Sequence, residues 1–399
     1  MSATVLQRAT ILGGDVVDVR LAGETIHSVA ATITPQPDDV VVDLDGHLLL
    51  ASAVEPHAHL DKAFLAERIE NPTGDLMGAI LAMEASRHLL NVPDIIERAE
   101  RAARLMASNG YAAVRTHADT TKEHGLRSIE ALLEVKQRVA DVIDVQIVAL
   151  CGWPMMGADG AANRALMRDA LDAGADVVGG CPHLEGEASA AATDFFLELA
   201  AEFEVPVDLH TDETLDRGAC GLSDLARGVL AGFPHGATAS HCVSLGQLPA
   251  DEQRAVAELV AEAGVSVIAL PHTNLFLQGR GAAPMPRGLT GVASLRTAGV
   301  NVAAGADNLQ DPFNPVGRAC PFETAGLMIM AVHDLPGVAW SSVTDAPRRA
   351  LGLPAAAVTP GAPADLMAVR AATVREAIAT GPPGRRVWRR GVRIDETER

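Results

Sequence analysis

The sequence has few lysines and an excess of acidic residues. Its only lysines are Lys62, Lys122 and Lys136, and the 399 residues carry a formal net charge of −19. A protein without a basic stripe cannot neutralise the phosphates of a nucleic acid. We therefore expect no nucleic-acid partner.

Signals for export and for membrane insertion are also missing. The first eight residues contain no charged segment followed by an apolar one. No apolar stretch reaches the roughly 20 residues that a bilayer span requires. The five cysteines are widely spaced and form no Cys-x-x-Cys pair, which is typical of reduced thiols. We expect a cytoplasmic protein without a membrane partner.

Two further motifs are absent. A zinc cytidine-deaminase fold needs a Pro-Cys-x-x-Cys pair beside a His-x-Glu, and the sequence has no such pair. It has no Gly-Lys-Ser/Thr phosphate loop, and Gly279-Arg280-Gly281 lacks the third glycine of a dinucleotide-binding fingerprint. The sequence therefore gives no support to a nucleotide cofactor.

The chain does contain a regular alternation of short apolar runs with segments of helical periodicity. Strand and helix alternating eight times predict an α/β protein with a parallel (β/α)8 barrel of the TIM type. We place the barrel at residues 48–357. Its strands are expected at 48–54, 112–115, 145–150, 176–180, 205–209, 237–240, 265–270 and 300–304.

The two ends of the chain have a different pattern. Residues 1–47 alternate small apolar and polar residues, with turn signals between them, and strand-like segments recur at 364–369 and 386–394. We expect residues 1–47 and 358–399 to pair in a small β-sandwich beside the barrel.

A pair of histidines follows the first apolar run. Residues i and i+2 of a strand point to the same face, so His57 and His59 can both reach one metal ion. Neutral imidazole is a common ligand of first-row metals. Two histidines of a polar turn would give the same pattern, so the interpretation depends on the rest of the chain.

The other predicted strands end on residues of the same kind. Active sites of (β/α)8 barrels lie at the carboxyl ends of the strands, where residues distant in sequence converge. All eight ends except Cys151-Gly152-Trp153 carry a histidine or an acid. Beyond the first pair these residues are His117, His183, His210, His241, His272 and Asp307.

Three of the acidic and histidine side chains are candidates for catalysis. Glu213 lies in a loop, three residues after a potential ligand, and could accept a proton from a metal-bound water. The alternative for it is a solvated acidic loop, which we assign to Asp212. His241 could polarise a substrate or be a buried structural histidine. Asp307 can bind the metal, accept a proton or do both, whereas Asn308 can only form hydrogen bonds.

Together these residues resemble the metal-dependent amidohydrolase superfamily. The pattern His57-x-His59, His210-x-x-Glu213, His241 and Asp307 is similar to its metal and catalytic residues. The segments 56–61, 270–280 and 307–315 resemble its cytosine deaminase-like branch. The resemblance implies metal ligands at His57, His59, His210 and Asp307, and catalytic roles for Glu213, His241 and Asp307.

The same resemblance implies the reaction. We expect an aminohydrolase that cleaves a C–N bond of a small nitrogen heterocycle of the cytosine or isocytosine type and releases ammonia. Hydrolysis of a cyclic amide or of an N-alkylamino triazine on the same site is an alternative. A non-catalytic binding protein is a remote one, because no ligand position is lost. The expected partner is the small heterocycle, and a homo-oligomer is compatible with the sequence.

Two departures from the cytosine deaminase pattern concern the substrate. Gly152 stands where those enzymes carry a substrate-binding glutamine, and Asn308 replaces a second aspartate. We therefore predict that cytosine is a poor substrate and that a ring with another donor–acceptor pattern is preferred. The expected substrate contacts are Trp153, Gln278, Asn308 and Phe313.

The expected metal count also follows from the resemblance. Binuclear members of the superfamily commonly bridge two ions with a carboxylated lysine at the end of strand four. Here that position reads Gly179-Gly180-Cys181-Pro182-His183, without a lysine. We expect one divalent ion per chain, either zinc or iron(II), because the ligand types do not choose between them.

Overall fold

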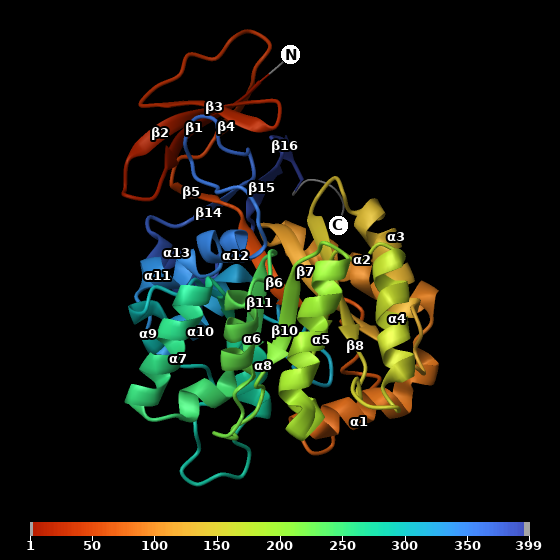
Figure 1. Cartoon of the computed structure of the whole chain (residues 1–399). Helices are drawn as coiled ribbons and strands as arrows, with labels where there is room; N and C mark the ends of the chain where they lie inside the picture. Colours follow the sequence, from red (N-terminus) through yellow and green to blue (C-terminus); the bar gives the residue numbers. More distant parts are fainter. Residues whose placement is uncertain (1–2, 395–399) are drawn as a thin grey trace.

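The chain folds into a barrel with a second sheet beside it. A computed structural model describes residues 3–394. In Figure 1 the sheet built from the two ends of the chain lies above the barrel. Among the described residues, no helix is both long enough and apolar enough to cross a membrane.

The barrel consists of eight parallel strands in chain order, as predicted. It closes where the backbone N–H of Asp307, just after β13, donates to the carbonyl of His57 in β6 at 3.0 Å. The strands are β6 (Ala53–Ala58), β7 (Tyr111–Thr120), β8 (Asp144–Cys151), β9 (Val177–Gly180), β10 (Val207–Thr211), β11 (Ala237–His241), β12 (Ser266–Ala269) and β13 (Val302–Ala304).

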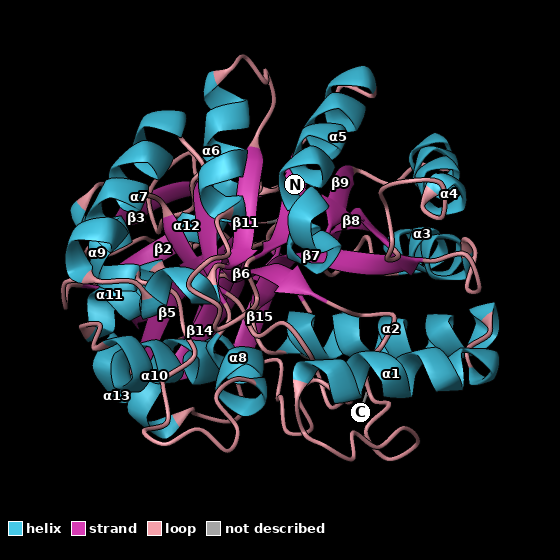
Figure 2. Ribbon diagram, turned by 60° about the horizontal axis from the view of Figure 1, so that its bottom comes forward, coloured by secondary structure: helices cyan, strands magenta, loops and turns pink. Residues whose placement is uncertain are grey.

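Helices surround these strands (Figure 2). In α2 the side chain of Asn91 caps the first turn by accepting from the N–H of Asp94, and Ile95, Ala99 and Met106 bury one face at helical spacing. The main helices of the ring are α2 (Val92–Ser108), α3 (Arg127–Arg138), α4 (Ala161–Asp172), α5 (Ser189–Glu202), α6 (Gly221–Leu230), α7 (Ala250–Ala263), α9 (Val292–Thr297) and α10 (Pro321–Val332).

Other helices cover the rims and connect the two parts. They are α1 (Leu76–Ser86), η1 (Arg87–Leu89), η2 (Pro182–Ala188), η3 (Val243–Gln247), α8 (Pro271–Leu277), α11 (Pro336–Ser341), α12 (Asp345–Ala350) and α13 (Val374–Thr380).

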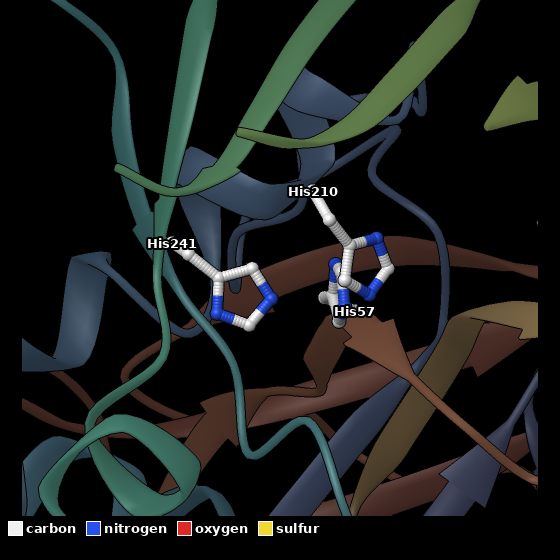
Figure 3. Close-up of side chains that lie close together, drawn as sticks. All are labelled: His57, His210 and His241. Carbon is white, nitrogen blue, oxygen red and sulfur yellow. The ribbon is translucent and has the colours of Figure 1, made fainter. Parts of the chain in front are cut away.

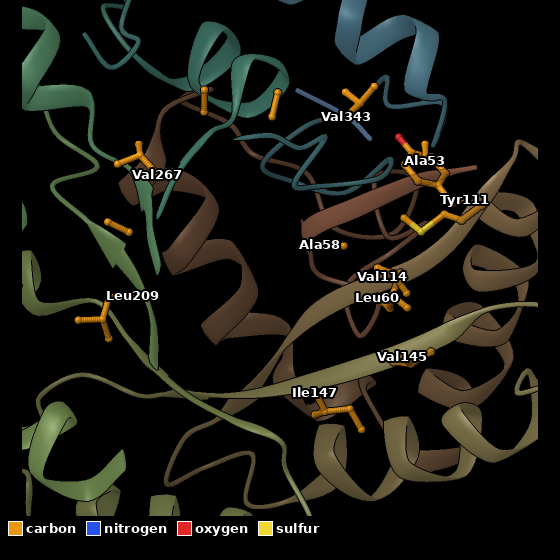
Figure 4. Packing of buried hydrophobic residues seen from close by; sticks show 14 of the residues in the cluster. Ala53, Ala58, Leu60, Tyr111, Val114, Val145, Ile147, Leu209, Val267 and Val343 are labelled. Atoms are coloured by element: carbon orange, nitrogen blue, oxygen red, sulfur yellow. The ribbon is translucent and has the colours of Figure 1, made fainter. Parts of the chain in front are cut away.

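The core lies between the strands and the helices. Val114, Ile147, Leu209 and Val267 are fully buried there, one on each of four strands (Figure 4). Side chains alternate along a strand, so the residues between these apolar positions point into the barrel. Arg115 does so, because its guanidinium crosses to a carboxylate on β10. The barrel interior is therefore polar while its outer face is apolar.

The two ends of the chain pair in the second sheet. In it β5 and β14 run antiparallel, with Leu48 opposite Val369 and Leu50 opposite Met367. The strands of this sheet are β1 (Thr4–Thr10), β2 (Val16–Ala22), β3 (Thr25–Ala30), β4 (Val40–Asp43), β5 (His47–Ala51), β14 (Leu366–Arg370), β15 (Arg386–Arg389) and β16 (Val392–Arg393).

The apolar run at 48–54 is two strands instead of the expected one. The N–H of Ser52 donates to Asp365, which precedes β14, whereas that of Ala53 donates to Gly110, which precedes β7. The chain thus passes from the terminal sheet to the barrel at this point. The domain boundary expected between residues 47 and 48 falls inside β5, because an apolar run alone does not show which sheet it joins.

The terminal strands form one connected sheet that curls around its own core. Near opposite ends of the strand order, β3 and β15 contribute Ile26 and Trp388 to one buried cluster. Leu6 of β1 and Leu49 of β5 complete the middle of that cluster. The small unit therefore has a separate hydrophobic core.

Candidate metal centre and active site

Five predicted residues converge at the carboxyl ends of the strands. The Nε2 atoms of His59 and His210 lie 3.2 Å apart, and the Nε2 atoms of His57 and His59 lie 3.6 and 3.3 Å from Asp307 Oδ1. His241 Nε2 lies 4.0 Å from Asp307 Oδ2. Figure 3 shows the rings of His57, His210 and His241 grouped around one point. These residues come from β6, β10, β11 and the end of β13.

Their donor atoms fit a divalent metal ion. His57 Nε2 and both carboxylate oxygens of Asp307 are buried without a hydrogen-bond partner. A buried polar atom that stays unpaired costs free energy, and a metal ion would satisfy these atoms together. The atoms of His57, His59 and Asp307 lie within 4.8 Å of one another, as do those of His57, His210 and His241.

The electrostatics of the centre favour neutral imidazoles. Burial, followed by the neighbouring imidazoles, lowers the pKa of His57 and of His210 well below the ordinary value. Burial also lowers the pKa of His241 to about 4. A neutral imidazole has a free lone pair, which metal binding requires.

A buried chain of hydrogen bonds orients His57. Its Nδ1 atom lies 2.8 Å from Ser240 Oγ, which donates to Asp208 Oδ1 at 2.9 Å. Arg115 donates to the other oxygen of Asp208 at 2.8 Å. Because Ser240 gives its proton to the carboxylate, it accepts the Nδ1 proton of His57, which leaves Nε2 free to face the centre.

This chain of hydrogen bonds was not predicted, although the sequence contains a signal for a polar barrel interior. Asp208 lies two residues before His210, and Thr238 lies two residues before Ser240. Polar residues at every second position of a parallel barrel strand indicate a polar interior, because such strands are normally apolar on both faces.

Asp307 is positioned by its backbone and by Glu55. Its φ angle is 65°, a left-handed conformation that is uncommon outside glycine and that clusters at functional sites. Glu55 accepts hydrogen bonds from the N–H groups of Ala306 at 3.0 Å and His57 at 3.3 Å. Burial raises the pKa of Glu55 to about 8. This side chain, which the sequence analysis missed, joins the first and last barrel strands beside the centre.

Glu213 and His241 share one partner. Asn274 on α8 donates from Nδ2 to Glu213 Oε1 at 3.3 Å and to His241 Nδ1 at 3.0 Å. Since Nδ1 accepts, the proton of His241 lies on Nε2. Burial, and then the charge of Asp307, raises the pKa of Glu213 well above its ordinary value. Asn274 was not predicted, because it lies in a helix that follows β12.

A cavity of about 430 Å³ opens onto the centre. His59, His210, Glu213, His241 and Asp307 all line it. Its outer part is apolar where side chains of α1 face it. Those side chains are Leu76, Met77, Ile80, Leu81 and Met83.

The predicted substrate contacts differ in where they lie. Trp153, Asn308 and Phe313 line this cavity, with Trp153 60 % exposed at its mouth. Gln278 lines a neighbouring cavity, and its side chain donates to the backbone oxygen of Glu213 at 3.3 Å. The structure therefore does not bring Gln278 to the metal centre. His272, expected at a strand end, faces Glu323 at 3.6 Å instead.

Asn308 and Gly152 have little freedom. Asn308 donates to Asp311 at 2.8 Å and accepts from Thr273 at 3.1 Å, so its amide already has partners. A side chain at Gly152 would start 3.0 Å from Thr121. The cavity thus lacks an amide at Gly152 and has a fixed one at Asn308.

Taken together, the fold and this centre define a barrel hydrolase with a histidine and carboxylate metal site. The chain belongs to the amidohydrolase family, whose model matches residues 63–395. Members of this family are metal-dependent.

Individual proteins with known names are similar to the chain over most of its length. A pterin deaminase of Rhizobium rhizogenes (strain K84 / ATCC BAA-868) is 33 % identical over 387 residues, covering 95 % of this chain and 88 % of that one. The structure of 5-methylcytosine deaminase from Klebsiella pneumoniae liganded with 5-fluorocytosine has a TM-score of 0.89 and 31 % identity, covering 99 % and 98 %. N-isopropylammelide isopropylaminohydrolase from Burkholderia multivorans has a TM-score of 0.83 and 28 % identity, covering 99 % and 98 %.

Proposed function

We propose that the protein is a metal-dependent deaminase that hydrolyses an exocyclic C–N bond of a small nitrogen heterocycle and releases ammonia. The observation that carries this proposal is the convergence of unpaired imidazoles and a carboxylate on a cavity that Glu213 also lines. Two of the relatives are named as deaminases of pterin and of 5-methylcytosine, and these names support the same reaction class.

The proposed ligands are His57, His59, His210 and Asp307, holding one zinc or iron(II) ion. When bound, the ion supplies Lewis acidity that lowers the pKa of a water molecule. His241 is assigned a different role, because the proton on its Nε2 prevents that atom from binding a metal at the same time. The absence of a lysine after β9 supports a single ion.

Glu213 is the proposed proton carrier. Its raised pKa makes Oε1 a good proton acceptor in a buried site, and Asn274 holds that oxygen in place. A proton taken from the attacking water by Glu213 can be passed to a ring nitrogen, which makes the neighbouring carbon more electrophilic. The second proton of that water, carried by Glu213 to the exocyclic nitrogen, would let this nitrogen leave as ammonia. His241 Nε2–H and the Asp307 carboxylate face the same space and can orient that water.

The cavity supports a substrate larger than a single pyrimidine. Its apolar outer wall on α1 lies beyond the polar centre, so a ring bound at the metal would still face apolar surface. A fused bicyclic ring would cover this wall. We propose such rings as the preferred substrates, with cytosine as a poor one.

The same wall favours a second candidate reaction. Leu76, Ile80 and Leu81 could accommodate an alkyl group on the departing nitrogen, as in the isopropylamino group named for the Burkholderia relative. Release of an alkylamine in place of ammonia would use the same residues.

The test is a panel assay with purified protein loaded with zinc or with iron(II). Pterin, isocytosine, cytosine and N-isopropylammelide would be compared by release of ammonia or isopropylamine. We expect the highest kcat/KM with the bicyclic ring. Absence of amine release from every ring with both metals would refute the proposed function, and a clear preference for cytosine would refute the substrate part.

The site of action in the cell is proposed to be the cytoplasm. All five cysteines are free in the structure, and Cys242 is buried, which supports a reducing compartment.

A further inference from the structure

Arg87 lines the active-site cavity, and no described residue forms a hydrogen bond with its guanidinium. It begins η1, directly after α1, and lines the cavity that opens onto the metal centre. Its NH1 atom is buried and has no hydrogen-bond partner, and no described residue forms an ion pair with its guanidinium. A buried guanidinium nitrogen without an acceptor is costly, so a ligand oxygen at this place would remove that cost.

Asp119 lines the same cavity and offers a hydrogen-bond acceptor, where Arg87 offers donors. It follows Arg115 and His117 at every second position of β7 and so points into the barrel at its carboxyl rim. One oxygen accepts from Lys62 Nζ at 2.7 Å, and no described residue donates a hydrogen bond to the other. The side chain is 20 % exposed to the cavity.

The charge state of this pair is well defined. Burial would raise the pKa of Asp119, but the charges of Lys62 and Arg87 outweigh burial and hold it below the ordinary value. Lys62 itself is held between two carboxylates, Asp119 and, at 3.3 Å, Asp61. The cavity therefore holds a cationic donor, Arg87, and an anionic acceptor, the second oxygen of Asp119.

The donor of Arg87 and the acceptor of Asp119 are complementary to one edge of a heterocyclic ring, that of a lactam. A ring lactam, –CO–NH–, has an acceptor oxygen beside a donor N–H and no net charge. Gly152 has no side chain that could bind such an edge, and the amide of Asn308 is oriented by its hydrogen bonds with Thr273 and Asp311.

We propose that Arg87 and Asp119 together form the specificity subsite for a lactam edge of the substrate. The guanidinium of Arg87 donates to the ring oxo group, and the free oxygen of Asp119 accepts from the adjacent ring N–H. Lys62 is a positioning residue that holds Asp119. This inference rests on the proposed function, because it names the ring edge that this same site recognises.

The test measures binding without turnover, so it is independent of the reaction. Isothermal calorimetry on the full-length, metal-loaded protein would compare lumazine with 1,3-dimethyllumazine, and uracil with 1,3-dimethyluracil. The methylated rings keep the oxo groups and lack every N–H. We expect the wild type to bind at least one unmethylated ring about 10-fold or more tightly than its methylated partner, as loss of a charged hydrogen bond predicts.

Two variants separate the two contacts. Arg87→Met keeps the length of the side chain without its donors, and Asp119→Asn keeps its size without its charge. We expect each variant to weaken binding of the unmethylated ring by about 10- to 100-fold. Asp119→Asn should bring the preference over the methylated ring close to one. The preference should be reduced less in Arg87→Met, because the oxo group is common to both rings.

Arg254→Gln, at an exposed position on α7, is the matched control and should change neither affinity. Circular dichroism and metal content would check that each variant is folded and loaded. If Asp119→Asn fails to fold, the result for Arg87→Met decides, because no described residue forms a hydrogen bond or an ion pair with the Arg87 guanidinium.

The possible outcomes separate this inference from the proposed function. Equal affinity of the wild type for both members of each pair, no detectable binding of any ring, or unchanged affinities in both variants would overturn the lactam subsite. Ammonia release without a lactam preference would leave the proposed reaction standing and refute only the subsite. A lactam preference in a protein that releases no amine would refute the proposed reaction and leave the lactam subsite standing.

Discussion

At the scale of single residues, the centre depends on groups that are buried without partners of their own. His57 Nε2 and both oxygens of Asp307 have no hydrogen-bond partner, and the residues around them fix which atoms face the centre. Ser240 fixes the proton of His57, and Asn274 fixes that of His241. The roles proposed for these residues can be tested separately.

The first prediction concerns Glu213. Glu213→Gln preserves size and hydrogen-bonding capacity but removes the proton acceptor, so we expect turnover to fall by about 10² to 10⁴ while metal content is unchanged. Steady-state kinetics with elemental analysis would measure both. Glu258→Gln, at an exposed position on α7, is the control. Turnover close to that of the wild type would transfer the role to Asp307, the carboxylate that also lines the cavity.

The second prediction concerns Ser240. Ser240→Ala leaves both His57 Nδ1 and Asp208 Oδ1 without their shared partner, so the imidazole is no longer held in one orientation. We expect affinity for zinc to fall by about 10- to 100-fold, measured by competition with a chelator. Ser108→Ala at the exposed end of α2 should have no effect. If affinity is retained in Ser240→Ala, the hydrogen-bond chain does not support the ligand.

At the scale of the elements, the closure of the barrel between β6 and β13 is packed against the metal centre. A Cβ atom added at Gly305 would lie 2.4 Å from Glu55 Oε1. That carboxyl cannot move away freely, because it accepts the N–H groups of Ala306 and His57.

The third prediction follows from this contact. Gly305→Ala should lower the free energy of unfolding by about 1–3 kcal/mol, as overpacking in a core does, and should also weaken metal binding. Urea denaturation would measure the first effect. In the control Gly337→Ala, nothing lies within 4 Å of the new methyl group, so stability should stay equal or rise slightly. A Gly305→Ala protein as stable as the wild type would show that Glu55 is free to move.

The elements also show what could be predicted from the sequence. The strands and their order were predictable because apolar runs alternate with helical periodicity, and His57 and His59 because their spacing is local. The contact between His57 and Ser240 joins residues 183 positions apart, and that between Arg115 and Asp208 joins residues 93 apart. A single sequence can indicate that such residues face a polar interior, but it does not show which of them pair. For the same reason the run at 48–54 did not show that it divides between two sheets.

At the scale of the whole molecule, metal binding should stabilise the fold. An ion that binds only the folded chain adds free energy of unfolding, about 4 kcal/mol when free metal exceeds Kd 1,000-fold. The fourth prediction is therefore that a strong chelator lowers Tm by several degrees and that adding zinc or iron(II) restores it, as followed by calorimetry. An identical Tm with and without metal would show that these residues hold no ion.

The pairing of β5 with β14 has a consequence for how the chain is made. Their partners Leu48 and Val369 are more than 300 residues apart, and the whole barrel is encoded between them. During synthesis, β1 to β5 emerge first but cannot complete their sheet until residues 366–370 have left the ribosome. The exposed edge of β5 must therefore remain without its partner while the barrel strands are translated, a period of roughly 15–60 s at typical rates of elongation. This edge is where a newly made chain is most open to aggregation or to a chaperone.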